Sequence, residues 1–372
     1  MKVVTIIGTR PELIKLSRVI HELDRSVQHV LVHTGQNYDY ELNEIFFRDL
    51  AIRRPDHFLE VAGATLGETI GNVIARSYAA LQQERPDAAL LLGDTNSCLA
   101  AISAKRLQIP IFHMEAGNRC FDERVPEEVN RRIVDHTADI NLPYTEHARR
   151  HLLAEGIRSE TVIKTGSPMR EVLGFYRNGI DASDVLQRLG LEGDRYLVVS
   201  AHREENVDSE TNFGDLLDTL QAVSARYRMP LIVSTHPRTM KRLEAVGGIS
   251  GNADIRFMKP LGFFDYVKLE NGAFCVLSDS GTITEESSIL GFPAVTIRQA
   301  HERPEGMDVG TLVMAGLQAD RVLSAIELVR RHRDEGRRFQ LAPDYEAQDV
   351  SAKVVRIILS YTDYANRTVW RK

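Results

Sequence analysis

Three acidic residues stand where predicted strands end or predicted helices begin, and their carboxylates could transfer protons. Asp94 follows the apolar run 88–92, Glu115 follows the run 111–114, and Glu127 lies in the first turn of a predicted helix. Such residues often only cap a helix or complement its dipole. Ligands of open α/β sheets, however, bind beyond the carboxyl ends of the strands. The three carboxylates together therefore favour an acid–base site over three unrelated caps.

Two cationic residues accompany the first predicted strand. The β-branched run 3–7 ends in a tight turn, and a helix with apolar spacing follows from residue 12 to residue 23. Arg10 lies in the turn and Lys15 lies on the helix. Such a turn directs backbone N–H groups and a helix dipole at an anion. The turn is thus either an anion contact strengthened by these cations or an ordinary strand-to-helix connection.

The second half of the chain also places polar residues after its predicted strands. His202 follows one strand, and Ser280 and Gly281 precede the helix after another. Small residues at a helix N-terminus suit phosphate, and Glu286, one turn further on, could bind ribose hydroxyls. Arg303 supplies a cation after the next strand. Each position, taken alone, could equally serve as a helix cap or helix-end contact.

The elements that must position these residues alternate between strand and helix. Strands are expected at 3–7, 30–33, 88–92, 111–114, 140–142 and 162–164, and in a second series at 196–200, 231–234, 255–258, 275–277 and 294–297. This alternation predicts the α/β class, with two doubly wound parallel-sheet, Rossmann-like domains that face each other across a cleft. A weak pattern from 174 to 194 indicates the boundary between domains at 1–173 and 174–349, and the last helix, from 350, could join either domain.

Composition excludes several classes of protein. The 372 residues include 46 basic and 52 acidic ones, and the net charge of -6 argues against nucleic acid or an anionic membrane as a partner. The three cysteines are few and widely spaced, which excludes a disulfide framework and a CxxC site. No apolar run reaches the length of a membrane span or a signal-peptide core, so we expect a cytoplasmic protein.

Familiar cofactor motifs are absent from the sequence. No GxGxxG follows the first strand, which argues against a dinucleotide, and neither GxxxxGK[ST] nor HExxH occurs. His113 and Glu115 lie two residues apart and could share a strand face, but two ligands do not make a metal site. We therefore expect no cofactor and no metal.

Seven motifs together resemble the non-hydrolysing UDP-N-acetylglucosamine 2-epimerase family. They run in order from Gly8 to about Gly306, which is most of the chain: GTRPE with Lys15, GDTNS, HMEAGNR, RVPEEVNRR, SAHREEN, DSGTITEE and HERPE. The resemblance implies a two-domain fold like that of the GT-B glycosyltransferases, with the last helix, 350–372, crossing back to the first domain. It also implies a homodimer, a UDP-N-acetyl amino sugar as substrate, and neither nicotinamide nor metal.

The same resemblance assigns roles to single residues. It implies catalytic roles for Asp94, Glu115, Glu127 and His202, and contacts with substrate for Arg10 and Lys15. It also implies that UDP is held in the second domain by Ser280, Gly281 and Arg303 at the diphosphate, by Glu286 at the ribose and by Tyr266 near the uracil.

Several motifs depart from the common family pattern. GDTNS replaces GDTTT, EAGNR replaces EAGLR, and DSGTITEE replaces DSGGIQEE. The segment 36–42 replaces a QHR stretch associated with an activating second UDP-sugar, which puts such activation in doubt. With the segment 261–266, these variants resemble the branch that makes UDP-N-acetyl-L-fucosamine from UDP-2-acetamido-2,6-dideoxy-L-talose for bacterial capsule or O-antigen synthesis.

Inverting C2 without a nicotinamide requires loss of the C2 proton as UDP leaves C1, which gives a glycal that is reprotonated on its other face. This route needs acid–base residues and a cationic clamp, and the sequence offers both. Four alternatives remain open at this point. They are a UDP-N-acetylglucosamine/UDP-N-acetylmannosamine 2-epimerase, a hydrolysing epimerase that releases UDP, a GT-B glycosyltransferase and a silent UDP-sugar sensor.

Overall fold

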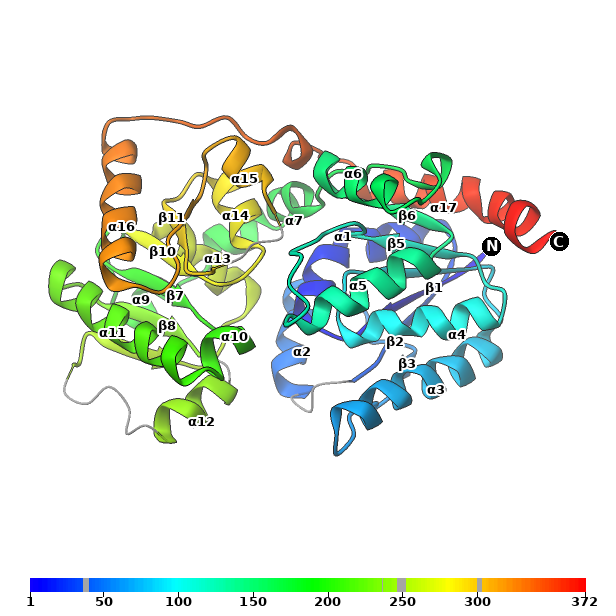
Figure 1. Ribbon diagram of the computed structural model, residues 1–372, viewed down its shortest axis with the longest axis horizontal. Coiled ribbons are helices and arrows are strands. Elements are labelled where there is room, and N and C mark those ends of the chain that lie inside the picture. The colour runs from blue at the N-terminus through cyan, green and yellow to red at the C-terminus, as the bar shows by residue number, and fades with distance from the viewer. Residues whose placement is uncertain (36–39, 236, 246–251, 300–302) are drawn as a thin grey trace. The chain divides into compact units, whose positions relative to one another are not determined.

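The computed structural model describes residues 1–35, 40–235, 237–245, 252–299 and 303–372 (Figure 1). The chain forms two compact units. Unit 1 consists of Met1–Phe175 and Pro343–Lys372, and unit 2 consists of Tyr176–Ala342. Among the described helices, none is both long and apolar enough to cross a membrane.

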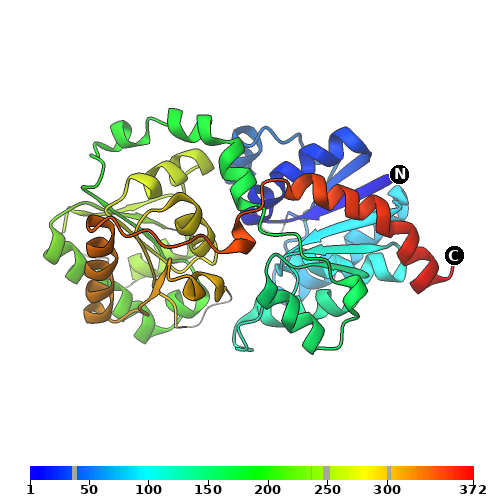
Figure 2. The ribbon, with the colours of Figure 1, turned by 90° about the horizontal axis from the view of Figure 1, so that it is seen from above.

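The end of the chain returns to unit 1. Asp344 accepts hydrogen bonds from the backbone N of Glu146 at 2.9 Å and from Lys164 Nζ at 2.7 Å. Helix α17 (Val350–Ala365) then packs against α1 (Arg10–Ser26), as Figure 2 shows. Residues 343–349, which the sequence pattern assigned to the second domain, belong to unit 1 because Asp344 anchors them there.

Unit 1 is built on a six-stranded parallel sheet with the order β3-β2-β1-β4-β5-β6. Its strands are β1 (Lys2–Ile7), β2 (Gln28–His33), β3 (His57–Phe58), β4 (Ala88–Leu92), β5 (Ile111–Met114) and β6 (Ile140–Leu142). Its other helices are α2 (Tyr40–Asp49), α3 (Leu66–Glu84), α4 (Ala100–Arg106), α5 (Pro126–Thr137), α6 (Glu146–Ala154) and α7 (Met169–Phe175). Three short 3₁₀ helices, η1 (Asn96–Leu99), η2 (Ser159–Thr161) and η3 (Pro343–Tyr345), and the π-helix η4 (Asn366–Trp370) complete the unit.

Unit 2 repeats this plan with the order β12-β11-β10-β7-β8-β9. Its strands are β7 (Leu197–Ser200), β8 (Leu231–Ser234), β9 (Ile255–Met258), β10 (Cys275–Ser278), β11 (Ala294–Thr296) and β12 (Val313–Met314). Its helices are α8 (Arg177–Ala182), α9 (Val185–Leu189), α10 (Glu204–Val207), α11 (Glu210–Tyr227), α12 (Pro237–Ala245), α13 (Phe263–Gly272), α14 (Ile283–Leu290), α15 (Glu305–Asp308) and α16 (Ala319–Asp334). The predicted pair of doubly wound parallel sheets is confirmed.

The central strands β4 and β7 are buried along their whole length because helices cover both faces of each sheet. All five residues of β4 are buried, as are the four residues of β7. A strand buried on both sides gains nothing from alternating polar residues, so its sequence becomes a continuous apolar run. This explains why the runs 88–92 and 197–200 predict their strands so well.

The strand order reverses at one place in each sheet. In unit 1 the chain passes from β1 to β2 on one side and later places β4 on the other side of β1. In unit 2 the same reversal lies between β7 and β10. Ligands of doubly wound sheets bind outside the carboxyl ends of the strands at such reversals.

The strand predicted at 162–164 is wrong. Only one bridge joins Val162 to Asn141, because the turn η2 precedes it directly and Gly166, with φ +86°, turns the chain soon after it. The short strands β3 and β12 were not predicted, since two residues are too few to show a pattern. The weakly patterned segment 174–194 contains the short helices α8 and α9.

Candidate active site

Glu115 occupies a strained position at the end of β5. Its backbone has φ +62°, a left-handed conformation that is uncommon for residues other than glycine. Its Oε2 pairs with Lys15 Nζ at 2.5 Å, and Asn118 Nδ2 lies 3.4 Å from its Oε1. Strained residues of this kind cluster at functional sites, where the surrounding structure holds them in place. The strain and the paired cation single out Glu115 among the acids of unit 1.

Asp94 lies beyond β4 and is held by helix α5. Arg131 donates to its Oδ2 from Nε at 2.9 Å and approaches it with Nη2 at 2.6 Å. Asn130 Nδ2 donates to the Asp94 carbonyl at 2.9 Å. The Asp94 side chain is 25% exposed, so solvent or a ligand reaches a carboxylate whose position is fixed.

Helix α5 carries two adjacent glutamates with different surroundings. Glu128 is fully buried and accepts hydrogen bonds from the backbone N of Cys120 at 3.1 Å and from Arg131 Nη1 at 2.9 Å. Glu127 is partly exposed in the first turn of the helix. Arg131 therefore joins the buried Glu128 to Asp94 and holds helix α5 against the turn after β4.

Glu12 is a buried carboxyl that the sequence analysis did not single out. It accepts hydrogen bonds from the backbone N–H groups of Gly8 and Thr9, and from the hydroxyl of Thr95. These bonds tie the turn after β1 to the turn after β4. Burial, assisted by the negative charge of Asp94, raises the pKa of Glu12 from 4.5 to about 7. The spacing of Thr9 and Glu12 is the only signal in the sequence, and it is typical of a capping box.

Arg10 and His113 also lie in unit 1, and their side chains make different kinds of contact. The Arg10 guanidinium lies over the Phe46 ring, 5.7 Å from its centroid, at the start of α1. His113 is fully buried, with Nδ1 2.9 Å from Asp135 and Nε2 2.8 Å from the Gly93 carbonyl. Both ring nitrogens are therefore engaged. Within the described ranges, no group of three or more His, Cys, Asp or Glu side chains could hold a metal ion.

In unit 2, the buried carboxylate of Asp279 organises the turn after β7. It accepts hydrogen bonds from the backbone N–H groups of His202 and Arg203, each at 2.9 Å, and from Asn206 Nδ2 at 3.0 Å. His202 Nδ1 lies 3.2 Å from Asp279 Oδ1, and its side chain is 44% exposed. Asp279 thus fixes the backbone from which His202 projects, a role that no sequence pattern indicated.

Ser280, Gly281 and two arginines surround the N-terminus of α14. A Cβ on Gly281 would lie 3.6 Å from Arg303 Nε and 3.8 Å from Arg203 Nη2. The Ser280 hydroxyl hydrogen bonds that of Thr282 at 3.0 Å. Arg303 is buried and forms an ion pair with the buried Glu285. Two guanidiniums beside a side-chain-free helix start form an arrangement suited to phosphate. The sequence pointed to Arg303 but not to Arg203.

Two further predicted residues lie beside this helix start. Glu286, in the first turn of α14, accepts a hydrogen bond from the Thr282 hydroxyl at 3.1 Å. Burial, assisted by the negative charges of Glu270 and Glu286, raises the pKa of Tyr266, on α13, well above its usual range. Among the predicted residues, the structure joins Lys15 to Glu115 in unit 1 and places Arg303 beside Gly281 in unit 2.

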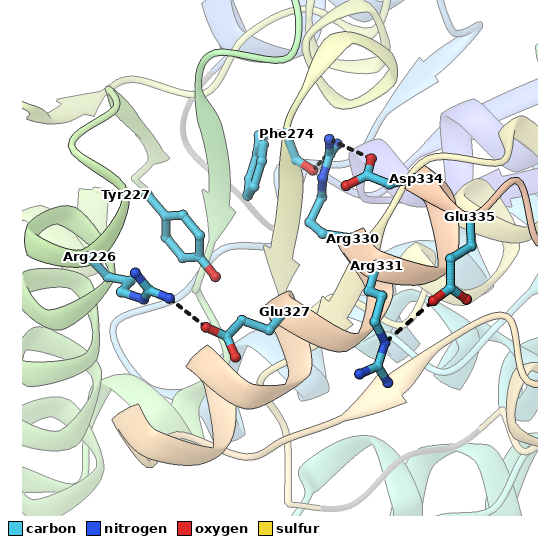
Figure 3. A pocket seen from close by; sticks show the side chains of 8 residues that line it. All are labelled: Arg226, Tyr227, Phe274, Glu327, Arg330, Arg331, Asp334 and Glu335. Atoms are coloured by element: carbon cyan, nitrogen blue, oxygen red, sulfur yellow. Dashed lines mark hydrogen bonds and ion pairs between the residues drawn. The ribbon is translucent and has the colours of Figure 1, made fainter.

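A second arginine-rich region of unit 2 is a pocket of about 490 Å³, in which carboxylates accompany the arginines. Figure 3 shows that its cationic groups are matched by carboxylates, with ion pairs Arg226–Glu327 at 2.8 Å, Arg330–Asp334 at 3.3 Å and Arg331–Glu335 at 3.9 Å. Its lining includes Tyr227, at the end of α11 before β8, and Phe274, directly before β10. The pocket thus lies at the amino end of the strands, opposite the edge where such sheets bind ligands.

Some residues of the predicted motifs lie outside the described ranges. They are Gln36, Asn37, Tyr38 and Asp39 of the segment 36–42, His236 after β8, and His301 and Glu302 of HERPE.

This chain is similar in sequence and structure to several known proteins. The family model described as UDP-N-acetylglucosamine 2-epimerase matches residues 21–359. A solved structure of UDP-N-acetylglucosamine 2-epimerase from Rickettsia bellii is 54% identical, covers 100% of both chains and has a TM-score of 0.93. The Methanocaldococcus jannaschii UDP-GlcNAc 2-epimerase, solved with UDP-GlcNAc and UDP, is 30% identical over 97% of this chain and 100% of that one, with a TM-score of 0.90. The Pseudomonas aeruginosa UDP-2,3-diacetamido-2,3-dideoxy-D-glucuronate 2-epimerase is 32% identical over 87% of this chain and 91% of its own length.

Proposed function

The chain belongs to the UDP-N-acetylglucosamine 2-epimerase family and is a UDP-sugar 2-epimerase, an isomerase; from this premise we propose how it works and on which sugar. The reaction inverts C2 of a UDP-2-acetamido sugar through a glycal. The C2–H bond breaks and its electrons form the C1–C2 double bond, while the C1–O bond breaks and UDP leaves with that electron pair. A proton then returns to the opposite face of C2 as UDP adds back to C1.

The observation that carries this proposal is the position of Glu115. It lies at a strand end, in a strained backbone conformation, with Lys15 at 2.5 Å and the fixed carboxylate of Asp94 at the end of the neighbouring strand. Inversion requires one group to remove the proton and another to return it on the other face. We assign Asp94, Glu115 and Glu127 to this proton transfer, with Lys15 setting the charge of the group.

We propose that residues of unit 2 bind UDP, which is the leaving group. Ser280, Gly281 and Arg303 would bind the diphosphate at the start of α14, and His202 would stabilise its developing charge. Glu286 would accept hydrogen bonds from the ribose hydroxyls, and Tyr266 would lie near the uracil. Arg10 is proposed as an additional cation at the diphosphate. Each preorganised donor of this kind is worth on the order of 2 to 4 kcal/mol in the transition state.

For the substrate, we propose UDP-2-acetamido-2,6-dideoxy-L-talose, which C2 inversion converts to UDP-N-acetyl-L-fucosamine. The support is the set of variant motifs: Asn96 and Asn118 near the acids, Thr282 at the start of α14, and the segment 261–266. Such a sugar would serve bacterial capsule or O-antigen synthesis. We further propose that the enzyme acts in the cytoplasm as a homodimer.

A second candidate substrate is UDP-N-acetylglucosamine, with UDP-N-acetylmannosamine as its epimer. It is favoured by the 54% identity with the Rickettsia bellii protein and by the UDP-GlcNAc and UDP bound to the Methanocaldococcus jannaschii enzyme. The two candidates differ at C6, where one carries a methyl group and the other a hydroxyl. A pocket built to hydrogen bond a hydroxyl rejects an analogue that lacks it much more strongly than an apolar pocket rejects an added hydroxyl.

Turnover of both UDP-sugars in deuterated water tests the reaction and the substrate together. We expect deuterium at C2 with UDP retained, and a higher kcat/KM for the 6-deoxy-L-talose compound. Preference for UDP-N-acetylglucosamine would reverse the substrate assignment. Accumulation of free UDP would show a hydrolysing reaction, and no exchange with either compound would refute the proposed reaction.

A further inference from the structure

A buried cluster of hydrogen bonds joins helix α5 to the turn that carries Glu115. Its centre is Asp135 on α5, whose side chain is fully buried. Asp135 Oδ1 lies 2.9 Å from His113 Nδ1. Its Oδ2 accepts hydrogen bonds from the backbone N of Gly117 at 3.1 Å and from Arg119 Nη1 at 2.7 Å. One carboxylate therefore binds the strand before Glu115 and the backbone and a side chain after it.

His113 extends the cluster to the turn that carries Asp94. Its Nε2 lies 2.8 Å from the carbonyl oxygen of Gly93, the residue before Asp94. A carbonyl oxygen only accepts, and the Asp135 carboxylate, paired with a guanidinium, also only accepts. Both ring nitrogens of His113 must therefore carry a hydrogen. The cluster thus connects the turns after β4 and β5 through one imidazole ring.

Arg119 closes the cluster on its other side. Its buried guanidinium donates to the two carboxylate oxygens of Glu155, from Nε at 2.7 Å and from Nη2 at 2.6 Å. Glu155 is the C-cap residue of α6, and the hydrogen bonds from Arg119 lower its pKa to about 2. Arg119 Nη1 also donates to the Asn118 carbonyl at 2.6 Å. The backbone that follows Glu115 is therefore tied to both α5 and α6.

The turn needs this support because its backbone is strained. Glu115 has φ +62°, and Gly117 has φ +84°. A Cβ at Gly117 would clash with the carbonyl oxygen of Ala148, so the turn also packs closely on α6. Strained conformations persist only where the surrounding structure over-determines them. Without the cluster, we expect the turn to relax and to carry the Glu115 carboxylate away from Lys15.

We propose that Asp135, together with His113 and Arg119, is a positioning residue that holds the Glu115 carboxylate where it exchanges a proton with C2. The inference rests on the proposed function, in which Glu115 belongs to the proton-transfer group. It gives a task to buried charged groups that the reaction itself does not use.

Asp135→Asn tests the proposal, and Asp139→Asn is its matched control. Asp139 is also buried and also bound to β5, but at the amino end of that strand, where it accepts from the Ile111 backbone N at 2.9 Å and pairs with Lys105 at 2.5 Å. We expect Asp135→Asn to lower kcat at least about tenfold, as misplacement of a catalytic group does, and Asp139→Asn to keep kcat within about twofold. The Kd for UDP should change less than about twofold in both variants.

The ¹⁵N NMR spectrum of His113 provides a second readout. In the wild type both ring nitrogens should carry a hydrogen. In Asp135→Asn, the amide oxygen can still accept from Arg119, which leaves the amide N–H₂ group facing His113 Nδ1, so this nitrogen should lose its hydrogen. The spectrum should be unchanged in Asp139→Asn. A role in stability alone would lower the stability of both variants without this division in kcat and in the His113 spectrum.

Wild-type kcat in Asp135→Asn, equal losses of kcat in the two variants, or an unchanged His113 spectrum in Asp135→Asn would each overturn the proposal. If Asp135→Asn does not fold, Glu155→Gln carries the comparison, because the Glu155 side chain is 28% exposed. It should lower kcat about threefold through the weakened hold on Arg119, and an unchanged kcat would overturn the proposal. Wild-type protein that exchanges no deuterium at C2 would instead refute the proposed reaction. Wild-type kcat in Asp135→Asn beside a large loss in Glu115→Gln would refute the positioning role and leave the reaction intact.

Discussion

At the carboxyl edge of the unit 1 sheet, the carboxylates that follow β4 and β5 are paired with side-chain cations; at the same edge of unit 2, the carboxylate that follows β10 is bound by backbone amides. Asp94 pairs with Arg131 and Glu115 with Lys15, whereas the buried Asp279 is satisfied by N–H groups. The two sheets have the same strand order about their reversals. The shared topology therefore fixes where a ligand binds, and the loops decide what chemistry happens there.

This contrast predicts opposite results from substitutions in the two units. Changes at the unit 1 edge should depress proton transfer and spare UDP affinity. Changes at the unit 2 edge should weaken UDP binding first. Measuring both quantities for each variant decides whether the division of labour is real.

The largest expected effect is that of Glu115→Gln. The substitution keeps the shape of the side chain but removes its capacity to carry a proton, so we expect kcat to fall on the order of 10³-fold. UDP affinity should change less than about twofold. Deuterium incorporation at C2 and UDP calorimetry measure the two effects. Glu160→Gln, at an exposed turn of unit 1, is the control and should leave both unchanged. Full activity in Glu115→Gln would remove this residue from the proton-transfer group.

The next effect concerns Glu12 and pH. Its pKa is raised from 4.5 to about 7, so the folded protein holds a proton in this interval that the unfolded chain has lost. The raised pKa increases the free energy of unfolding. This increase is complete below pH 4.5 and is lost as pH rises to about 7. The loss should amount to about 3 kcal/mol. Denaturant unfolding at a series of pH values should show this slope in the wild type.

Glu12→Gln is the matched variant for the pH experiment. A glutamine keeps an acceptor for the N–H groups of Gly8 and Thr9 but does not titrate. The difference in unfolding free energy between wild type and Glu12→Gln should therefore change across this interval and be constant above it. If this difference in unfolding free energy is the same at every pH, Glu12 is ionised in the folded protein. The carboxyl edge of the unit 1 sheet would then carry one more negative charge than we infer.

Gly281→Ala tests the unit 2 edge without disturbing the fold. The added methyl group would lie at 3.6 Å from Arg303 and 3.8 Å from Arg203, which are ordinary contact distances, so stability should be unchanged. The methyl group would occupy the space between the guanidiniums, and the loss of one charge-assisted hydrogen bond to phosphate should cost about 2 kcal/mol of UDP affinity. Calorimetry with UDP measures it.

Gly214→Ala is the control for Gly281→Ala. Gly214 lies on α11 with nothing within 4 Å of its Cβ position, so alanine should leave UDP affinity unchanged and slightly raise stability. Unchanged UDP affinity in Gly281→Ala would contradict a phosphate position at the start of α14. A fall in kcat alone would contradict the division of labour between the units.

The sequence indicated most of the strands and the two doubly wound sheets because these depend on local pattern. A buried parallel strand such as 88–92 is a continuous apolar run, and the acid after it is visible directly. The same reasoning failed at 162–164. These three residues have a sequence suited to a strand, but they form only a single bridge, and the pattern does not distinguish the two cases. The roles given to the site residues stay predictions, because the chemistry of a side chain depends on the ligand atoms that it meets.

The partners of these residues could not be read from the sequence. Lys15 and Glu115 are 100 residues apart in the chain, and Asp279 follows His202 by 77. Such pairs form because separate strands end at the same edge of one sheet, and which strands become neighbours depends on the whole fold. Burial has the same origin, so the raised pKa of Glu12 appears only in the folded protein, where burial and the negative charge of Asp94 outweigh the hydrogen bond from Thr95.

The smallest expected effect is that of Arg226→Gln in the pocket of Figure 3. Arg226 is exposed and pairs with Glu327 at 2.8 Å, and this pocket lies at the amino end of the strands. Exposed ion pairs contribute little to stability, and this pocket lies away from the proposed UDP site, so UDP affinity should change less than about twofold. Arg203→Gln, at the carboxyl edge, should weaken UDP binding about tenfold. Equal effects of the two substitutions would mean that net positive charge, rather than the geometry at the start of α14, attracts the diphosphate.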